Sequence, residues 1–353
     1  MSSCLKANGH HPHLNHHLKL FNRNGSLYAS YSDGEVVLSS KIPTNSMDGR
    51  VEIIVNPTLL LSSLNALSSD IITIDRPNKT SPLKIHQKGF HFFIPWQDPS
   101  IYPEIPRPQT TPEPLPPGLL HQLANSLVPF SSSDQLHPSL NIVWLKLSPT
   151  NTWSSARNHN GFAYLLLPSL PKIIFQDGYL QLHSKLLIAA QKLFDIDSLV
   201  NITTDAKTIS LHDDDHSVAI PRLKCYPPDY SHLFLDDLPY QSKTIINRAD
   251  LISLLDRFRS LPFTKVGLEA HSNLLALLSG VEHEGATAFA SLKAETGTVL
   301  PTCVLPVDDL AKALRAFTAP AVSIKTLEAY PDLLILEGVS DPTLTVCLRT
   351  LPQ

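Results

Sequence analysis

The chain has 353 residues, of which 42% are hydrophobic and 17% are charged. These proportions exclude a chain that is disordered throughout, and the length predicts two or three domains rather than one compact core. The formal net charge is −4, which excludes a strongly basic nucleic-acid-binding protein, although contact with DNA depends on where the basic residues lie.

The N-terminal residues are polar and rich in histidine. Residues 1–17 contain no apolar segment of signal-peptide length, and no run in the chain approaches the roughly 20 apolar residues of a membrane span. The four cysteines are widely spaced, which is typical of reduced thiols in a cytoplasmic protein. A metal site needs fixed geometry, so we interpret the histidines as an exposed polar terminus. They are His10, His11, His13, His16 and His17.

Three stretches along the chain follow one pattern. Residues 51–75, 178–205 and 302–328 each contain an apolar or alternating run, a short amphipathic helix and a β-rich run. The second helical stripe begins 126 residues after the first, from 60 to 186, and the third begins 124 residues later, at 310. Two nearly equal spacings predict three copies of one unit of about 120 residues, a usual domain size. The stripes at i, i+4 and i+7 are Leu60, Leu64 and Leu67, then Leu186, Ala190 and Leu193, then Leu310, Leu314 and Phe317.

The segments around each helix repeat as well. A pair of strands with a polar turn precedes each helix, and a β-hairpin follows it. The balance of 30 prolines to 13 glycines also favours β-structure over long helices. The strand pairs lie at 26–40, 151–167 and 273–292, and the hairpins at 83–95, 208–221 and 333–348.

A second kind of helix opens two of the three copies. Residues 119–130 and 248–261 have helical apolar periodicity, and each follows a proline-marked connector, at 98–118 and 225–239. Asn247 is the predicted N-cap of the later helix. The first copy has no such opening helix, so it is predicted to be incomplete.

Residues 212–216 carry two imidazoles and three carboxylates, all of them side chains that bind first-row metals. One hypothesis is therefore a metal-dependent hydrolase that uses His212, Asp213, Asp214, Asp215 and His216. The corresponding turns of the other two copies have no such residues, and successive residues of a strand point to opposite faces. We therefore expect a hairpin turn here and no metal site, and the sequence also lacks a phosphate-binding glycine loop and a Gly-x-Ser-x-Gly elbow.

The three copies and their connectors resemble the bacterial sliding clamp, the β subunit of DNA polymerase III. The resemblance rests on domain order, on the connectors Tyr102–Pro106 and Pro228–Tyr230, and on the helix that begins "NRADLISLLDRF" at Asn247. It implies an α+β fold with antiparallel sheets outside and two helices per domain inside, and a head-to-tail dimeric ring. The implied clamp domains are residues 1–108, without the opening strand and helix, then 109–239 and 240–353.

The resemblance also implies a function without catalysis or cofactors. A closed ring of two chains would encircle double-stranded DNA without sequence preference, and would tether the replicative polymerase and other replication and repair proteins. Polymerase and clamp loader would dock through a short peptide motif, and no membrane partner is expected. The incomplete first copy leaves a second alternative open, namely a clamp-fold regulator or decoy that does not close a ring.

Two sets of residues would carry this work if the resemblance holds. The inward helix faces would bind DNA, and the helices at 57–67 and 119–130 carry no charge, so the positive lining would be thin. The implied DNA-binding residues are Lys185, Lys192, Arg248, Arg257, Arg259, Lys312 and Arg315. The implied partner-peptide pocket comprises Asn160, Gly161, Phe162, Leu235, Val346, Cys347, Leu348 and Arg349.

The pocket residues depart from the family pattern. The run "SARNHNGFA" stands where a run like "ATDGHRLA" is usual, and Leu348-Arg349 stands where Met-Pro is usual. Pro306 and Asp309 replace residues that are commonly Asn and Tyr. We therefore expect an altered pocket that binds an altered peptide motif. The other reading is that these residues belong only to the core and to strand edges.

Overall fold

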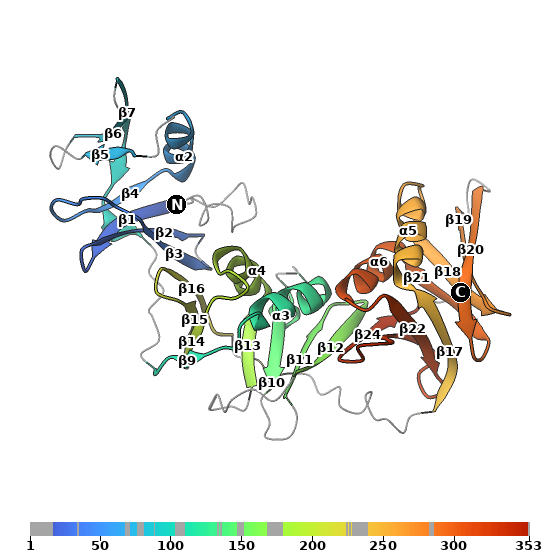
Figure 1. Ribbon diagram of the computed structural model, residues 1–353. Helices are drawn as coiled ribbons and strands as arrows, with labels where there is room; N and C mark the ends of the chain where they lie inside the picture. Colours follow the sequence, from blue (N-terminus) through green and yellow to red (C-terminus); the bar gives the residue numbers. More distant parts are fainter. Residues whose placement is uncertain are drawn as a thin grey trace. The chain divides into compact units, whose positions relative to one another are not determined.

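A computed structural model gives the arrangement of the chain (Figure 1). The segments that the structure describes are 17–33, 35–67, 71–75, 81–87, 89–102, 110–132, 134, 136–146, 152–167, 179–223, 225, 227, 239–281 and 286–351.

The same order of elements occurs three times: four strands, one helix, then three strands. In each repeat the first three strands form an antiparallel meander, and the fourth pairs back with the first. The first repeat contains β1 (His17–Arg23), β2 (Ser26–Ser32), β3 (Val37–Ile42), β4 (Glu52–Val55), α2 (Pro57–Asn65), β5 (Thr73–Asp75), β6 (Leu83–Gln87) and β7 (Phe90–Ile94). The prediction of an internal repeat is therefore confirmed in the order and pairing of the elements.

The second repeat is preceded by helix α3. It contains β10 (Ile142–Lys146), β11 (Thr152–Arg157), β12 (Gly161–Leu167), β13 (Tyr179–His183), α4 (Ser184–Leu193), β14 (Asn201–Thr204), β15 (Thr208–His212) and β16 (His216–Pro221). The segment between the first two repeats contains β8 (Trp96–Gln97), η1 (Pro99–Ile101), β9 (Glu113–Pro114), α3 (Leu119–Leu127), η2 (Val128–Phe130) and η3 (Pro138–Asn141).

The third repeat is preceded by a strand and a helix, β17 (Tyr240–Asn247) and α5 (Arg248–Arg259). It contains β18 (Lys265–His271), β19 (Leu274–Val281), β20 (Ala286–Thr296), β21 (Leu300–Pro306), α6 (Val307–Ala316), β22 (Ala321–Leu327), β23 (Leu333–Gly338) and β24 (Leu344–Arg349). The predicted opening strand and helix are thus present before the third repeat, whereas residues before His17 lie outside the described part of the chain.

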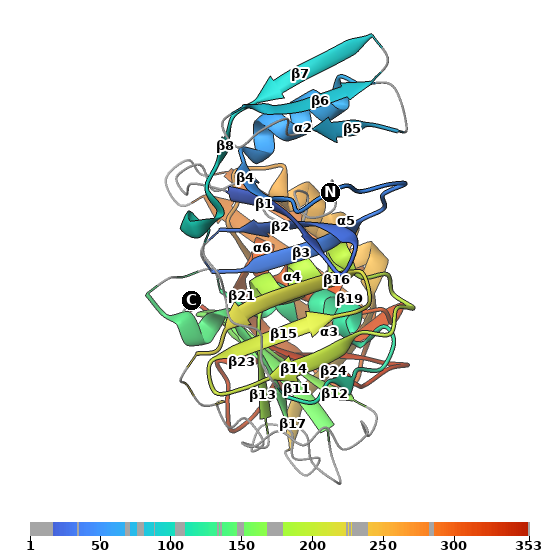
Figure 2. The same ribbon diagram turned by 90° about the vertical axis from the view of Figure 1, so that its left-hand side faces the viewer.

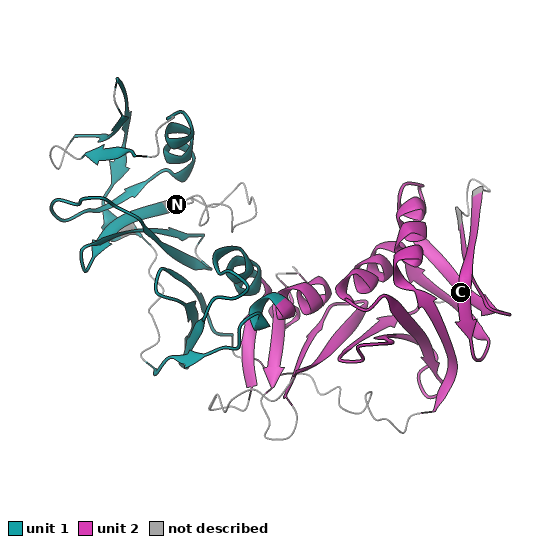
Figure 3. Cartoon of the chain, viewed as in Figure 1, with its two compact units in different colours: residues 1–121, 185–223 teal, residues 122–184, 224–353 magenta. Residues whose placement is uncertain are grey.

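The chain forms two compact units, coloured separately in Figure 3. Unit 1 comprises residues 1–121 and 185–223, and unit 2 comprises residues 122–184 and 224–353. Unit 1 contains a nine-stranded sheet in the order β8-β4-β1-β2-β3-β16-β15-β14-β9 and the three-stranded sheet β5-β6-β7. Figure 2 faces the larger of these sheets, with β1, β2, β3, β16, β15 and β14 in succession. Unit 2 contains one twelve-stranded sheet, β13-β10-β11-β12-β24-β23-β22-β17-β20-β19-β18-β21.

Each large sheet contains a junction between repeats. In unit 1, β16 of the second repeat pairs antiparallel with β3 of the first, through Val218 opposite Leu38. In unit 2, β24 of the third repeat pairs antiparallel with β12 of the second, through Cys347 opposite Phe162. In both cases the last strand of one repeat joins the third strand of the repeat before it. The repeats are therefore connected by backbone hydrogen bonds as well as by the chain.

Helix ends follow local sequence signals. The Asn247 side chain accepts hydrogen bonds from the backbone N–H groups of Ala249 (2.9 Å) and Asp250 (3.2 Å), which confirms the predicted N-cap of α5. The predicted helix over 119–130 ends at Leu127 and continues as one 3₁₀ turn, because Pro129 has no N–H for the α-helical ladder.

Two equivalent hairpins form the same left-handed turn conformation with different residues. The β1–β2 turn has positive φ at Asn24 (51°) and Gly25 (76°), and the β18–β19 turn has it at Ser272 (47°) and Asn273 (67°). Two-residue turns of this kind match the right-handed twist of the strands that they join, and Asn and Gly tolerate the conformation best.

The helical stripes that revealed the repeat face the core. Leu60, Leu186 and Leu310 are fully buried, and each is the first residue of the apolar stripe of its helix. Leu314 and Phe317 are buried below α6 in the same way, whereas Leu64 of α2 is half-buried. Among the helices that the structure describes, none is long and apolar enough to cross a membrane.

Candidate functional site

Helix α4 carries two of the predicted DNA-binding cations on one face. Lys185 and Lys192 are two helical turns apart, with the partly exposed Ile188 between them. The Lys185 ammonium forms an ion pair with the Glu35 carboxylate from the β2–β3 turn of the same unit. Lys192 is exposed in the last turn, where a cation also interacts favourably with the helix dipole.

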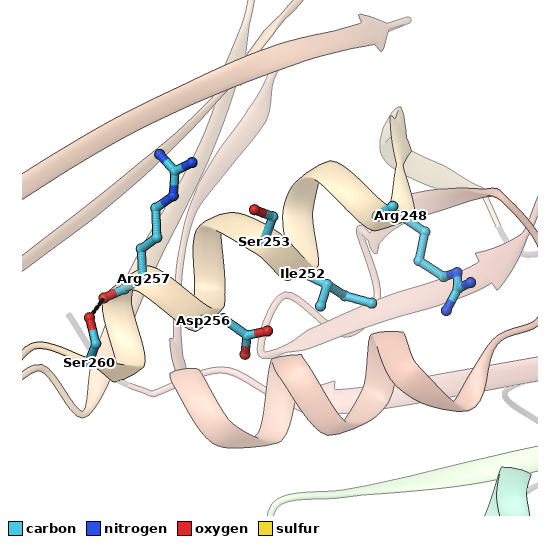
Figure 4. Close-up of a pocket in the computed structure, with 7 residues that line it drawn as sticks. Arg248, Ile252, Ser253, Asp256, Arg257 and Ser260 are labelled. Atoms are coloured by element: carbon cyan, nitrogen blue, oxygen red, sulfur yellow. Dashed lines mark hydrogen bonds between the residues drawn. The ribbon is translucent and has the colours of Figure 1, made fainter.

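Helices α5 and α6 of unit 2 carry the other five predicted cations and lie against each other. An open groove of about 580 Å³ runs along α5 (Figure 4). Asp256 points toward the neighbouring helix, whereas the Arg257 side chain extends away from it. The groove is lined by Arg248, Ala249, Ile252, Ser253, Asp256, Arg257 and Ser260.

The five cations of α5 and α6 differ in their surroundings. Arg257 and Lys312 are exposed, and Arg248 is half-buried with an Nε that has no hydrogen-bond partner in the described structure. Arg259 and Arg315, by contrast, both contact carboxylates. Four acidic residues lie on the same two helices, Asp250, Asp256, Asp308 and Asp309, so the net positive charge of this pair is small.

The uncharged helices are also as expected. Neither α2 nor α3 has an acidic residue in its first turn or a basic residue in its last. The sequences of both helices, PTLLLSSLN and LLHQLANSL, contain no Lys, Arg, Asp or Glu. Positive charge on the described helices is therefore confined to α4, α5 and α6.

The predicted peptide-pocket residues come together at the β12–β24 junction. Residues more than 180 positions apart pair directly, with Gly161 opposite Leu348 and Phe162 opposite Cys347. Phe162 and Cys347 are buried in one cluster with Leu327 and Ile335. Burial also raises the pKa of the Cys347 thiol, which keeps it protonated and unreactive. Val346 is fully buried as well, so these side chains contribute to the core of the junction.

The polar pocket residues lie at the exposed end of the same junction. Asn160 Nδ2 donates a 2.7 Å hydrogen bond to Asp309 Oδ2 on α6, and its backbone C=O accepts one from the Arg349 N–H (2.8 Å). The Arg349 side chain is 70% exposed, with its Nε 3.9 Å from a carboxylate oxygen of Asp332. Asp309, one of the departures from the family pattern, thus holds the turn that carries Asn160.

Some predicted residues lie outside the described part of the chain. They are Leu235 of the pocket and most of the two connectors, residues 103–106 and 228–230. The structure does describe Tyr102 at the start of the first connector, where its buried hydroxyl donates to Ser30 Oγ at 2.9 Å. The role of Leu235 therefore stays a prediction.

The acidic 212–216 stretch forms the predicted β15–β16 turn. Asp213 Oδ1 accepts hydrogen bonds from the backbone N–H groups of Asp215 (2.8 Å) and His216 (2.5 Å), so this carboxylate stabilises the turn itself. Asp215 forms an ion pair with Lys41 at 3.1 Å. No group of three or more His, Cys, Asp or Glu residues able to hold a metal was found among the described residues. The structure therefore does not favour the metal-hydrolase hypothesis.

Known proteins resemble this chain in structure but not detectably in sequence. No protein-family model matches the sequence, and a search of curated proteins by sequence gives no match. Solved structures do match over nearly the whole chain. The β subunit of Streptococcus pyogenes DNA polymerase has a TM-score of 0.85 at 15% identity, covering 100% of this chain and 96% of its own. This chain has the bacterial sliding-clamp fold.

Two further clamps give the same result. The DNA polymerase III β subunit of Pseudomonas aeruginosa matches with a TM-score of 0.84 at 15% identity, covering 99% of this chain and 96% of its own. The Helicobacter pylori β clamp, solved with a DNA ligase peptide, matches with a TM-score of 0.78 at 17% identity, covering 95% of this chain and 91% of its own. The fold implied by the repeat and the connectors is therefore confirmed, including its large antiparallel sheets.

Sequence reasoning missed the acidic partners of the predicted DNA-binding residues. Asp256 and Arg259 are three residues apart on α5, a spacing that signals a pair on one helix face. The contacts of Arg315 with Asp256 and of Arg259 with Asp308 join two helices, and helical spacing gives no signal for them.

Proposed function

We propose that this protein is a DNA sliding clamp, a non-catalytic ring of two copies that encircles duplex DNA and tethers other replication and repair proteins to it. The main support for this proposal is the pairing of strands between repeats. The same pairing occurs twice within the chain, and one further pair of strands that could join in this way is left unpaired.

The pairing of the last strand of one repeat with the third strand of the repeat before it predicts how two copies would form a closed ring. β3 of the first repeat pairs with β16, the last strand of the second, and β12 of the second pairs with β24, the last strand of the third. By the same rule, β20 of the third repeat would pair with β7, the last strand of the first. That pairing is absent from the described strand pairs of the single chain. A second copy would supply it, and head-to-tail pairing at both ends would close a ring.

Both of these strands have an open, apolar edge. β7 pairs only with β6 in the described sheet, and Phe90 and Phe93 are 55% and 58% exposed. β20 pairs with β19 along its length but with β17 only through Ala294–Thr296. Phe289, in the remaining part of β20, is 69% exposed. Exposed apolar strand edges are unfavourable in a monomer and are typical of strands that pair with another chain.

The charges suit a ring better than a tight DNA-binding protein. A closed ring stays on DNA by topology, so its contacts with phosphates need only be weak and independent of sequence. The seven predicted DNA-binding residues lie on α4, α5 and α6, and they face fixed carboxylates at several positions. This supports sliding contact with DNA.

We further propose that polymerase and clamp-loader subunits dock through a short peptide at the β12–β24 junction. The H. pylori clamp was solved with a DNA ligase peptide bound, which supports a peptide site in this fold. In this chain the peptide would contact the exposed Asn160 and Arg349 beside the buried Phe162 and Leu348. The clamp domains would be residues 1–108, 109–239 and 240–353, and the protein would act in the cytoplasm, where a bacterial chromosome is replicated.

A threading experiment tests this function without an identified loader. The full-length protein is incubated with linear duplex DNA that has free ends, the ends are then ligated, and the mixture is passed through a sizing column in high salt. Retention on the ligated circle, release when a restriction enzyme cuts the circle, and a dimer in sedimentation support the clamp. A dimer that washes off the circle would refute it.

The same experiment separates the clamp from its closest alternative. A clamp-fold regulator that does not close a ring would remain monomeric at micromolar concentration and would show no dependence on DNA topology. The matched control adds the protein only after the circle has been ligated. Equal retention in that control would indicate simple affinity for DNA rather than encirclement.

A further inference from the structure

Four charged side chains form an alternating chain across α5 and α6. Arg315 Nη2 donates to Asp256 Oδ1 at 2.5 Å, Arg259 Nη1 lies 3.5 Å from the same oxygen, and Arg259 Nε donates to Asp308 Oδ1 at 2.7 Å. We name the set Arg315, Asp256, Arg259 and Asp308 the ion chain. It contains two cations and two anions, so it carries no net charge while all four are ionised.

The members of the ion chain lie at the surface. Their side chains are between 41% and 64% exposed. Arg315, through its hydrogen bond and its charge, and to a smaller extent Arg259 hold the pKa of the Asp256 carboxyl below its usual value. Asp256 is therefore charged at neutral pH, and both arginines face a fixed anion.

Exposed ion pairs contribute little to stability, since solvent screens the attraction and side-chain entropy opposes it. Two arginines and two aspartates on neighbouring helices thus give the fold little that uncharged residues would not. Their electrostatic effect on a ligand is larger. A carboxylate in contact with a guanidinium repels phosphate, and it largely cancels the field of the guanidinium within the roughly 10 Å over which exposed charges act at moderate salt.

We propose that Asp256 and Asp308 limit the affinity of the ring for DNA by neutralising Arg315 and Arg259 on the helices that face the duplex. This inference rests on the proposed clamp function. The other three cations on α5 and α6 do not contact the carboxylates of the ion chain, so they would attract phosphates more strongly. They are Arg248, Arg257 and Lys312. Weak contact lets a topologically held ring move along DNA, and the two aspartates set how weak the contact is.

The expected effect follows from counterion release. Each additional phosphate contact steepens the dependence of log K on log salt by about 0.9. Between about 50 and 200 mM salt, one such contact changes the affinity by a further 3- to 4-fold. Asp256→Asn releases Arg315 and part of the restraint on Arg259, so we expect a slope steeper by about 1, and about 2 for Asp256→Asn with Asp308→Asn.

The test measures binding of the full-length protein to a short fluorescent linear duplex across a salt series. Glu328→Gln is the matched control, because it removes one negative charge from an exposed loop residue of the same unit, outside α5 and α6. Asp256→Asn combined with Arg315→Gln is the second variant. It removes the same carboxylate but also the arginine that the carboxylate neutralises.

The expected result is tighter binding and a steeper salt slope for Asp256→Asn, with both effects reduced in the Arg315→Gln combination and absent in Glu328→Gln. An unchanged slope in Asp256→Asn would overturn the inference. So would an equal gain in Glu328→Gln, or a gain that stays at full size without Arg315. Thermal unfolding of each variant identifies loss of fold. Failure of the proposed function is distinct, because it appears in the unmodified protein as loss of retention on ligated circles.

Discussion

Phe289→Ala is expected to weaken the two-copy ring while leaving the chain folded. The Phe289 side chain is 69% exposed in the single chain, so removing it costs the monomer little core packing. Full burial of a phenylalanine stabilises by about 1.5–3 kcal/mol, and burial of the exposed fraction at a seam contributes roughly 1–2 kcal/mol. A head-to-tail ring has two identical seams, so the loss is roughly 2–4 kcal/mol, which makes the dimer about 30- to 900-fold weaker.

Sedimentation velocity over a concentration series measures this change directly. The matched control is Leu199→Ala, because Leu199 is 62% exposed and lies between α4 and β14, away from the open strand edges. We expect the control to dimerise like the unmodified chain. A Phe289→Ala dimer of unchanged strength would refute the β7–β20 seam, and an equal loss in the control would show that the effect does not depend on position.

Three further substitutions test the fold around the site. Gly161→Ala would place its Cβ 2.3 Å from the Cys347 carbonyl oxygen, so we expect the free energy of unfolding, measured with denaturant, to fall by about 2 kcal/mol or more. Gly267→Ala is the control and should cost much less, because the nearest atom to its added Cβ is 3.6 Å away. Glu52→Gln leaves the buried Lys19 ammonium without its carboxylate, and we expect a loss of roughly 1–2 kcal/mol, moderated because Glu52 is partly exposed. The hydrogen bond from Lys19 lowers the pKa of Glu52, so the stabilisation by this ion pair is complete above the ordinary glutamate pKa and is lost as pH falls through the lowered pKa. Acid unfolding of Glu52→Gln should therefore lack this pH-dependent loss of stability. Asn247→Ala removes both cap hydrogen bonds of α5 and should lower the free energy of unfolding by about 1 kcal/mol, measured by thermal unfolding. An unchanged free energy of unfolding would contradict the cap.

The repeat could be predicted because it depends on the local spacing of apolar residues along the chain. Leu60, Leu186 and Leu310 recur at nearly equal spacing, and each is buried for the same reason, since an amphipathic helix must cover its sheet. Hairpins were predictable in the same way from alternation and turn residues. Burial pattern tolerates extensive substitution, which explains how the fold persists at 14–17% identity where sequence comparison finds nothing.

Features that depend on distant residues could not be predicted from patterns. The family resemblance placed Phe162 and Cys347 in one pocket but did not give their strand pairing, and nothing in either strand alone indicates its partner. The same holds for Arg315 and Asp256, which lie on different helices. The exposure of Phe289 was also hidden, because its strand has the alternation of a half-buried one, and only the sheet order identifies the edge that is left open.

The β12–β24 junction has a consequence for how the protein is synthesised. β24 ends at Arg349, near the end of the 353-residue chain, yet it lies within the twelve-stranded sheet of unit 2, between β12 and β23. The nascent chain must therefore keep the β12 edge unsatisfied while almost 180 more residues emerge from the ribosome, since β12 ends at Leu167 and β24 begins at Leu344. The sheet of unit 1, by comparison, has all its strands once Pro221 is made. Folding during translation would thus finish the sheet of unit 1 early and leave the sheet of unit 2 exposed to aggregation until β24 has been made.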